Sequence, residues 1–250
     1  MTSGGNNSPI SESIAASQGS EHCCPEQVIV DNRNLTLAER RTFLKQAAAG
    51  LFGGAASLLC APNVLAAGKV KTVVIDAGHG GHDVGAHEGR VFEKHLNFDV
   101  SRRLQIQLKR KGYRTVMTRD RDEFIPLLTR ASISNKYRDN IFVSIHFNSA
   151  WRTTAVGIET FYYGYAGYQL ASKVHSSIIR KLKPEDRGVK RQQFSVLRNT
   201  KAPAILVEGG FISNAKERQR CLQPWYRQAL AESIASGISS YDSASVRGRV

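Results

Sequence analysis

The stretch VVIDAGHGGHDVGA, residues 73–86, joins an apolar segment to an unusual loop. Its β-branched start predicts a buried strand that ends at Asp76. The loop that follows contains four glycines, two histidines and a second aspartate. The glycines are either turn formers or they let the backbone approach something held by His79. The rest of the chain must decide between these two interpretations.

Composition places the chain among globular proteins with an anionic partner. It has 250 residues, 41% of them hydrophobic, and a formal net charge of +14. Such a charge favours a nucleic acid, a membrane surface or a carboxylate-rich polymer. Nucleic acid is the weaker prediction, because the basic residues are scattered and no nucleic-acid-binding signature appears. We therefore expect no nucleic-acid partner.

The first 67 residues have the pattern of an export signal rather than of a fold. Residues 1–38 are polar and predict a disordered leader. Residues 39–67 contain paired arginines, a short apolar run and a small-residue end, and they resemble a twin-arginine signal peptide. The apolar run, 47–60, is short for a membrane span. We expect periplasmic or extracellular localisation, with no stable membrane anchor after signal removal.

The remaining chain alternates strands and helices. It predicts one α/β domain over residues 68–240, with a mixed, mostly parallel central sheet flanked by helices on both faces. Residues 241–250 are expected to form a flexible tail, and Cys221 a partly buried small side chain. The predicted strands cover 71–76, 113–118, 141–148, 157–164 and 202–210, and the predicted helices cover 92–112, 126–137, 168–182, 215–223 and 226–238.

Three predicted strands end in groups that can carry chemistry. The first leads to His79, another to His146 and a third to Glu208. Sites in open α/β sheets gather beyond the carboxyl ends of the strands. Two histidines and a carboxylate suit zinc, and Glu93 at the start of a helix is the candidate third ligand. Each residue alone has a simpler explanation: a histidine in a hydrogen bond, or a glutamate that favours the helix dipole.

Glu208 has a stronger individual signal. It directly follows the apolar run AILV and precedes two glycines. An ionised carboxylate at the end of a buried strand is unfavourable unless a metal, a water or a cation compensates it.

Four motifs occur in order and carry a family resemblance: VVIDAGHGGHDVGA, FEKHLNFDVSRRL, SIHFNSA and APAILVEGGFISN. Together they resemble the zinc-dependent N-acetylmuramoyl-L-alanine amidases, over about residues 70–237. The resemblance implies that His79, Glu93 and His146 bind one zinc ion and that Glu208 is the catalytic glutamate. It also implies that the substrate is peptidoglycan, cut between N-acetylmuramic acid and L-alanine.

The motifs suggest further roles. Asp76 and Asp83 are candidates to hydrogen-bond the metal histidines, and Asn148, on the same side of its strand as His146, is a candidate substrate or supporting group. Arg130 could hold a substrate carboxylate, but we expect it to be a surface charge. Some periplasmic members of the family carry an inserted helix that plugs the zinc site. Only about twenty residues separate the helix 168–182 from the next family motif, so no autoinhibitory helix is expected.

Three other functions are alternatives to the amidase. A zinc peptidase acting within the stem peptide would fit the ligands, but the chain has no HExxH helix. A wall-binding module without activity conflicts with the intact set of four candidate site residues. A nucleic-acid-binding protein rests on charge alone.

Overall fold

The computed structural model describes residues 70–247. The expected leader, 1–38, and signal segment, 39–67, lie outside the described residues, as does the tail from 248. The strands are β1 (Thr72–Ala77), β2 (His87–Glu88), β3 (Val91–Phe92), β4 (Arg114–Met117), β5 (Asn140–Asn148), β6 (Ile158–Tyr162), β7 (Asp186–Arg191) and β8 (Ala204–Phe211). The helices are α2 (Glu93–Arg110), α3 (Leu127–Asn135), α4 (Tyr165–Leu182), α5 (Ser195–Arg198), α6 (Ala215–Cys221) and α7 (Pro224–Arg247).

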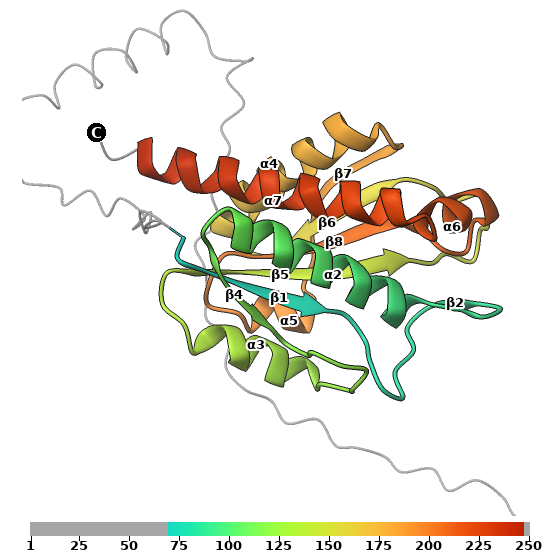
Figure 1. Ribbon diagram of the computed structural model, residues 1–250, viewed down its shortest axis with the longest axis horizontal. Coiled ribbons are helices and arrows are strands. Elements are labelled where there is room, and N and C mark those ends of the chain that lie inside the picture. The colour runs from blue at the N-terminus through green and yellow to red at the C-terminus, as the bar shows by residue number, and fades with distance from the viewer. Residues whose placement is uncertain (1–69, 248–250) are drawn as a thin grey trace, which may run out of the picture. The chain divides into compact units, whose positions relative to one another are not determined.

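Six strands form one central sheet in the order β4-β1-β5-β8-β6-β7. The first four run parallel, β6 runs antiparallel to β8, and β7 runs parallel to β6. The carboxyl ends of β1 and β5 point to the end of the domain where the β2–β3 hairpin projects (Figure 1). The predicted α/β class with a mixed, mostly parallel sheet is confirmed.

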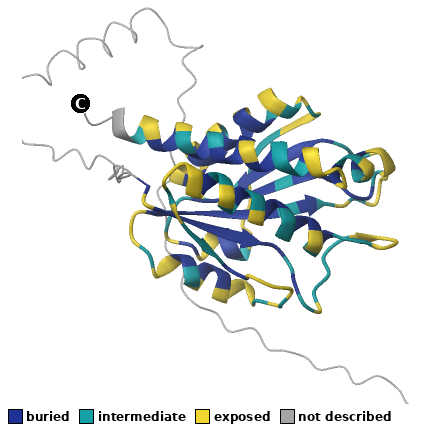
Figure 2. Ribbon diagram, viewed as in Figure 1, coloured by how far each residue is buried: buried dark blue, intermediate teal, exposed yellow. Residues whose placement is uncertain are grey.

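Alternate residues of β1 pack on opposite faces of the sheet. Val73 and Ile75 join the core under α2, α4 and α7, whereas Val74 joins a smaller core that includes two residues of α5. The predicted leucine and valine stripe of α2 lies in the larger core, and each of its members is at most 5% exposed: Leu96, Val100, Leu104 and Leu108. Burial therefore concentrates in the strands and on the inward sides of the helices (Figure 2).

The end of α2 follows the predicted stop signal. Gly112 has φ +84°, and its N–H donates to the carbonyl of Lys109. The next N–H, of Tyr113, donates to Leu108. This left-handed turn is readily adopted by glycine. It returns the chain directly into β4 beside β1.

The C-terminal prediction is wrong for residues 241–247. Helix α7 continues to Arg247, and Tyr241 and Asp242 are buried. The Asp242 carboxylate accepts from the Val70 N–H at 2.8 Å and from the Tyr113 hydroxyl at 3.1 Å. These contacts satisfy a backbone group at the entrance to β1, and the local polarity of the segment conceals them in the sequence.

Three strands and the short helix α5 were not predicted. β7 is a charged edge strand, and β2 and β3 form a two-residue hairpin pair before α2. Neither has the apolar pattern by which a strand is found in a sequence. None of the helices in the described part of the chain is both long enough and apolar enough to cross a membrane.

Candidate metal centre and active site

The sheet register brings the predicted site residues to one edge and one face. Asp76 is the ladder partner of Ser144, and His146 is the partner of Glu208. Side chains alternate along a strand. Asp76, His146 and Glu208 therefore project on the same face as Val74, which is the face covered by α3 and α5.

His79, Glu93 and His146 converge into one cluster. Their candidate ligand atoms all lie within 4.8 Å of one another. His79 Nε2 is 3.1 Å from Glu93 Oε2, and His146 Nδ1 is 2.9 Å from Glu93 Oε1. The structure thus brings together the three residues proposed as ligands, although they come from a loop, a helix and a strand.

The backbone of the glycine-rich loop lies so close to this cluster that two of its positions require glycine. A Cβ added at Gly78 would lie 2.3 Å from the imidazole ring of His146. A Cβ added at Gly85, where φ is +68°, would lie 2.6 Å from Glu93 Oε2 and 2.7 Å from the His79 ring. These two glycines therefore allow the backbone to pass directly beneath the cluster, as the second interpretation of the loop proposed.

His79 is oriented by its neighbours on both sides. Both carboxylate oxygens of Asp83 lie 2.9 Å from its Nδ1, so its Nε2 faces Glu93. Its backbone has φ +60°, which is unfavourable for a residue with a Cβ. Arg130 donates to the His79 carbonyl at 2.9 Å and helps to hold this conformation. Burial lowers the pKa of His79, but hydrogen bonds and charges from Glu93 and Asp83 outweigh burial and raise it.

Glu93 is buried and receives hydrogen bonds on both oxygens. Oε2 accepts from the Ala86 N–H at 2.9 Å, and Oε1 accepts from the Phe147 N–H and from the Asn97 side chain, each at 3.1 Å. Burial alone would raise the pKa of Glu93, but His146 and His79 hold it well below the usual value. The carboxylate is therefore fixed and ionised, as a metal ligand must be.

Glu208 lies at the wall of a hollow of about 470 Å³ next to the cluster. Its Oε2 atom is buried and has no hydrogen-bond partner among the described residues. Burial, together with the charges of Glu93 and Glu159, raises its pKa well above the usual value. The hollow is also lined by apolar side chains that include Phe124, Leu127 and Phe194. A ligand in this hollow would therefore lie beside Glu208 and the two histidines together.

The comparisons with known proteins agree with this site. Residues 73–240 match the family model described as N-acetylmuramoyl-L-alanine amidase. The chain belongs to this family. The match covers the glycine-rich loop, the histidine cluster and Glu208.

Two curated relatives and one solved structure illustrate the similarity. The uncharacterized protein YqiI of Bacillus subtilis is 38% identical over 191 residues, which are 74% of this chain and 92% of that protein. The N-acetylmuramoyl-L-alanine amidase LytC of the same species is 34% identical, over 68% of this chain and 35% of LytC. The catalytic domain of CwlV, an N-acetylmuramoyl-L-alanine amidase of Bacillus (Paenibacillus) polymyxa, is 36% identical with a TM-score of 0.67, over 68% of this chain and 97% of that one.

Asp76 supports the glycine-rich loop of the amidase domain through Arg130. Arg130, expected at the surface, is 2% exposed and donates to Asp76 Oδ1 at 2.9 Å. Thr118 and Ser144 complete the environment of the Asp76 carboxylate, at 2.7 and 2.6 Å. Among these partners there is no histidine. The hydrogen bond expected between an aspartate and a candidate ligand histidine is made by Asp83 with His79, and Asp76 acts through Arg130, which holds the His79 carbonyl.

Asn148 leads to a buried carboxylate that the sequence interpretation missed. Its Nδ2 donates to Glu159 Oε1 at 2.6 Å. Glu159 is 5% exposed, lies on β6 and is the ladder partner of Glu208. The signal was present in GIETFYY, residues 157–163, because a glutamate inside an apolar strand needs the same explanation as Glu208. The role proposed for Asn148 stays a prediction.

The segment after β6 is short, and it is where an autoinhibitory helix would be inserted in the amidase. Residues 163–164 connect β6 directly to α4, which packs with α7 on the face opposite the hollow. That expectation stays a prediction.

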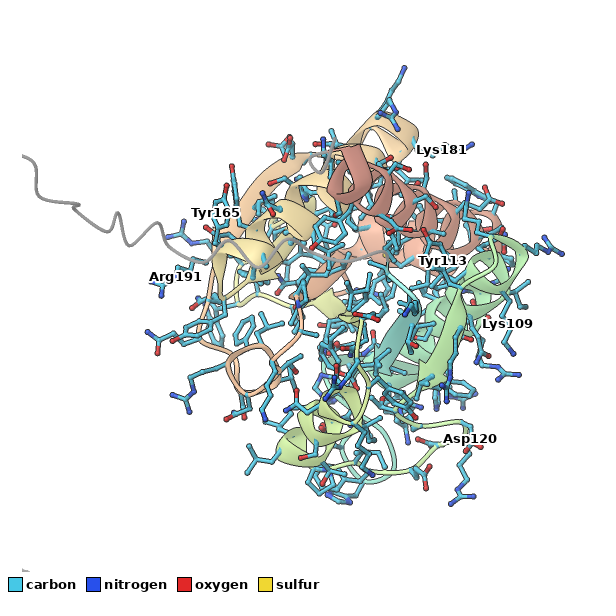
Figure 3. The ribbon with its side chains drawn as sticks, turned by 90° about the vertical axis from the view of Figure 1, so that its left-hand side faces the viewer. Lys109, Tyr113, Asp120, Tyr165, Lys181 and Arg191 are labelled. Atoms are coloured by element: carbon cyan, nitrogen blue, oxygen red, sulfur yellow. The ribbon has the colours of Figure 1, made fainter. Side chains whose placement is uncertain are left out.

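A second hollow, of about 500 Å³, lies at the other end of the amidase domain and is lined by tyrosines that include Tyr163 and Tyr165. Figure 3 views the domain from this end and labels Tyr165. His79, Glu93 and His146 do not line this second hollow.

Proposed function

We propose that this protein is an exported, zinc-dependent N-acetylmuramoyl-L-alanine amidase. It hydrolyses the amide bond between N-acetylmuramic acid and the L-alanine of peptidoglycan stem peptides. The observation that carries the proposal is the convergence of His79, Glu93 and His146 beside Glu208 at one hollow, in a chain of this family.

The residues present fit one zinc ion. Imidazole nitrogen and carboxylate oxygen are typical zinc donors, and three protein ligands are typical of catalytic zinc sites. The glycines beneath the cluster and the hydrogen bonds to Glu93 and His79 fix the donors before a metal arrives. Zinc supplies a Lewis acid that polarises a carbonyl group and lowers the pKa of water.

Glu208 is the proposed general base and acid. Its carboxyl group lines the hollow beside the histidine cluster and can accept a proton from the water that attacks the amide carbonyl carbon. The C–N bond then breaks, and Glu208 returns the proton to the departing amine of L-alanine. The site residues therefore divide into three that hold the metal and one that moves the proton.

The cellular setting follows from the sequence and from the relatives. We propose that residues 39–67 direct export by the twin-arginine route to the periplasm or the extracellular space. A relative from Staphylococcus epidermidis, 31% identical over 176 residues, is called a probable cell wall amidase. The net charge of +14 would hold the enzyme to an acidic wall by attraction that weakens with salt.

Mass spectrometry of purified peptidoglycan, incubated with the full chain and zinc, tests this function. Release of peptides that begin with L-alanine, together with peptide-free glycan, supports the amidase, and a chelator should abolish the release. Peptides cut internally would favour a stem-peptide peptidase instead. A protein that sediments with the wall but releases nothing would be a binding module.

A further inference from the structure

A charged row crosses three strands beside the catalytic edge. Glu208 of β8 faces Glu159 of β6, and Glu159 in turn contacts two cations of β7, Arg187 and Lys190. Glu159 Oε2 accepts from Arg187 Nε at 3.2 Å and from Lys190 Nζ. Both cations therefore reach the same face of the sheet as Glu208.

The row carries more positive charge than Glu159 requires. A buried carboxylate needs a partner, and either cation, together with Asn148, would supply one. Glu159 neutralises one of these two cations, so the β7 side of the row keeps one net positive charge. The side chains of Arg187 and Lys190 remain 35% and 43% exposed, so the surplus is open to solvent and to a ligand.

Lys190 is the more available of the two cations. Arg187 is also held by the ring of Phe211, 4.9 Å from its guanidinium carbon, and by the carbonyl of Val156. Among the described residues, the Lys190 side chain has a hydrogen bond to Glu159 alone. An ammonium group carries three donors on a flexible stem, so it can bind a second carboxylate without leaving the first.

The chemistry of the substrate indicates what this surplus would bind. The lactyl carboxylate of muramic acid is consumed in the scissile amide, so the free carboxylates belong to the peptide. Two strand spacings place β7 about 10 Å from β8, and an extended peptide advances about 3.3 Å per residue. We propose that Lys190, assisted by Arg187, forms a subsite for a free carboxylate of the stem peptide two or three residues beyond the scissile bond. This inference rests on the proposed function.

Glu159 is then a positioning residue. It holds Lys190 and Arg187 on one side and Asn148 on the other. It also separates the peptide subsite from Glu208, so that the cations do not pair directly with the catalytic carboxylate.

The test compares two substrates that differ only in charge. One is a muramoyl peptide with free carboxylates, and the other is the same compound with those carboxylates converted to carboxamides. The full chain loaded with zinc should show a higher kcat/KM, by about tenfold, for the first compound.

Lys190→Met should reduce this preference to about twofold, and Lys190→Arg should restore most of it. Lys181→Met removes an equal charge from an exposed position on α4 and should leave the preference unchanged (Figure 3).

The ratio of kcat/KM for the two substrates shows whether Lys190 recognises the peptide carboxylate or only supports Glu159. If Lys190→Met slows both substrates equally, Lys190 serves only Glu159 and the subsite is wrong. If the wild-type protein cleaves both compounds at equal rates, the subsite is wrong and the amidase function stands. If it cleaves neither, the proposed function fails and the subsite fails with it.

Discussion

Glu208 of β8 and Glu159 of β6 lie directly opposite each other in an antiparallel ladder. Like charges in this position destabilise a sheet, and the Glu159 charge contributes to the raised pKa of Glu208. The unfavourable pair lies at the edge of the sheet that carries the histidine cluster. This fold therefore accepts a local loss of stability where the proposed chemistry requires a free carboxyl group.

Gly78 should contribute strongly to metal affinity. In Gly78→Ala the new Cβ would lie 2.3 Å from the His146 ring, so the ring must move. We expect the zinc affinity to fall about tenfold to a hundredfold, as measured by competition with a chelator. Gly164→Ala is the control, because a Cβ there meets no atom within 4 Å. An unchanged affinity in Gly78→Ala would contradict the role assigned to the loop.

Asp83 should control the orientation of His79. Asp83→Ala removes the carboxylate that lies 2.9 Å from His79 Nδ1. The imidazole then loses its fixed tautomer and direction, and we expect zinc affinity to fall about tenfold or more. Asp120→Ala, at an exposed position, is the matched control and should bind zinc normally (Figure 3). Equal affinities in the two variants would refute this role.

The Asp76–Arg130 pair predicts a dependence of stability on pH. Burial raises the pKa of Asp76, but Arg130 and the hydrogen bonds from Ser144 and Thr118 outweigh burial and lower it. A lowered folded-state pKa stabilises the protein above the unfolded-state pKa of about 3.9, and this contribution is lost as the pH falls through the folded-state pKa.

Asp76→Asn should therefore destabilise the protein by about 3 kcal/mol near neutral pH, because Arg130 loses its buried counterion. Urea unfolding of the metal-free protein should show the wild-type advantage shrinking below about pH 4. An advantage that stays constant down to about pH 3 would show that the ion pair is not its source.

The end of α7 should contribute to stability. Asp242→Ala removes the acceptor of the Val70 N–H and of the Tyr113 hydroxyl. We expect a loss of about 1–2 kcal/mol in the free energy of unfolding, measured with urea. Ser243→Ala, one residue later at an exposed position, should have a much smaller effect. If both variants unfold alike, the contacts of Asp242 carry no stability.

The sequence predicted what local pattern and strand order control. The α2 stripe from Leu96 to Leu108 was found because helical periodicity reflects burial on one face. His79, His146 and Glu208 were found because parallel strands place their carboxyl ends at one edge. Assigning Glu93 to the metal required the family resemblance, since a glutamate in a first helical turn has an ordinary explanation.

The missed features depend on contacts between distant segments. Arg130 resembles any helical arginine in sequence, yet its partner Asp76 lies 54 residues away on β1. β7 is rich in charge because it is an edge strand whose cations pair with Glu159 on β6. Asp242 has its partner 172 residues earlier in the chain. Periodicity within a window of the sequence contains no information about such pairs.

The division of roles between the metal residues and Glu208 is the central claim, and one pair of variants tests it directly. Zinc content and amide hydrolysis should be measured on Glu208→Gln and Glu93→Gln beside the wild type. We predict that Glu208→Gln retains about one zinc ion per chain and loses at least about a hundredfold in rate, whereas Glu93→Gln loses both zinc and activity. A Glu208→Gln variant that hydrolyses the substrate at the wild-type rate, or a Glu93→Gln variant that keeps its zinc, would contradict the account.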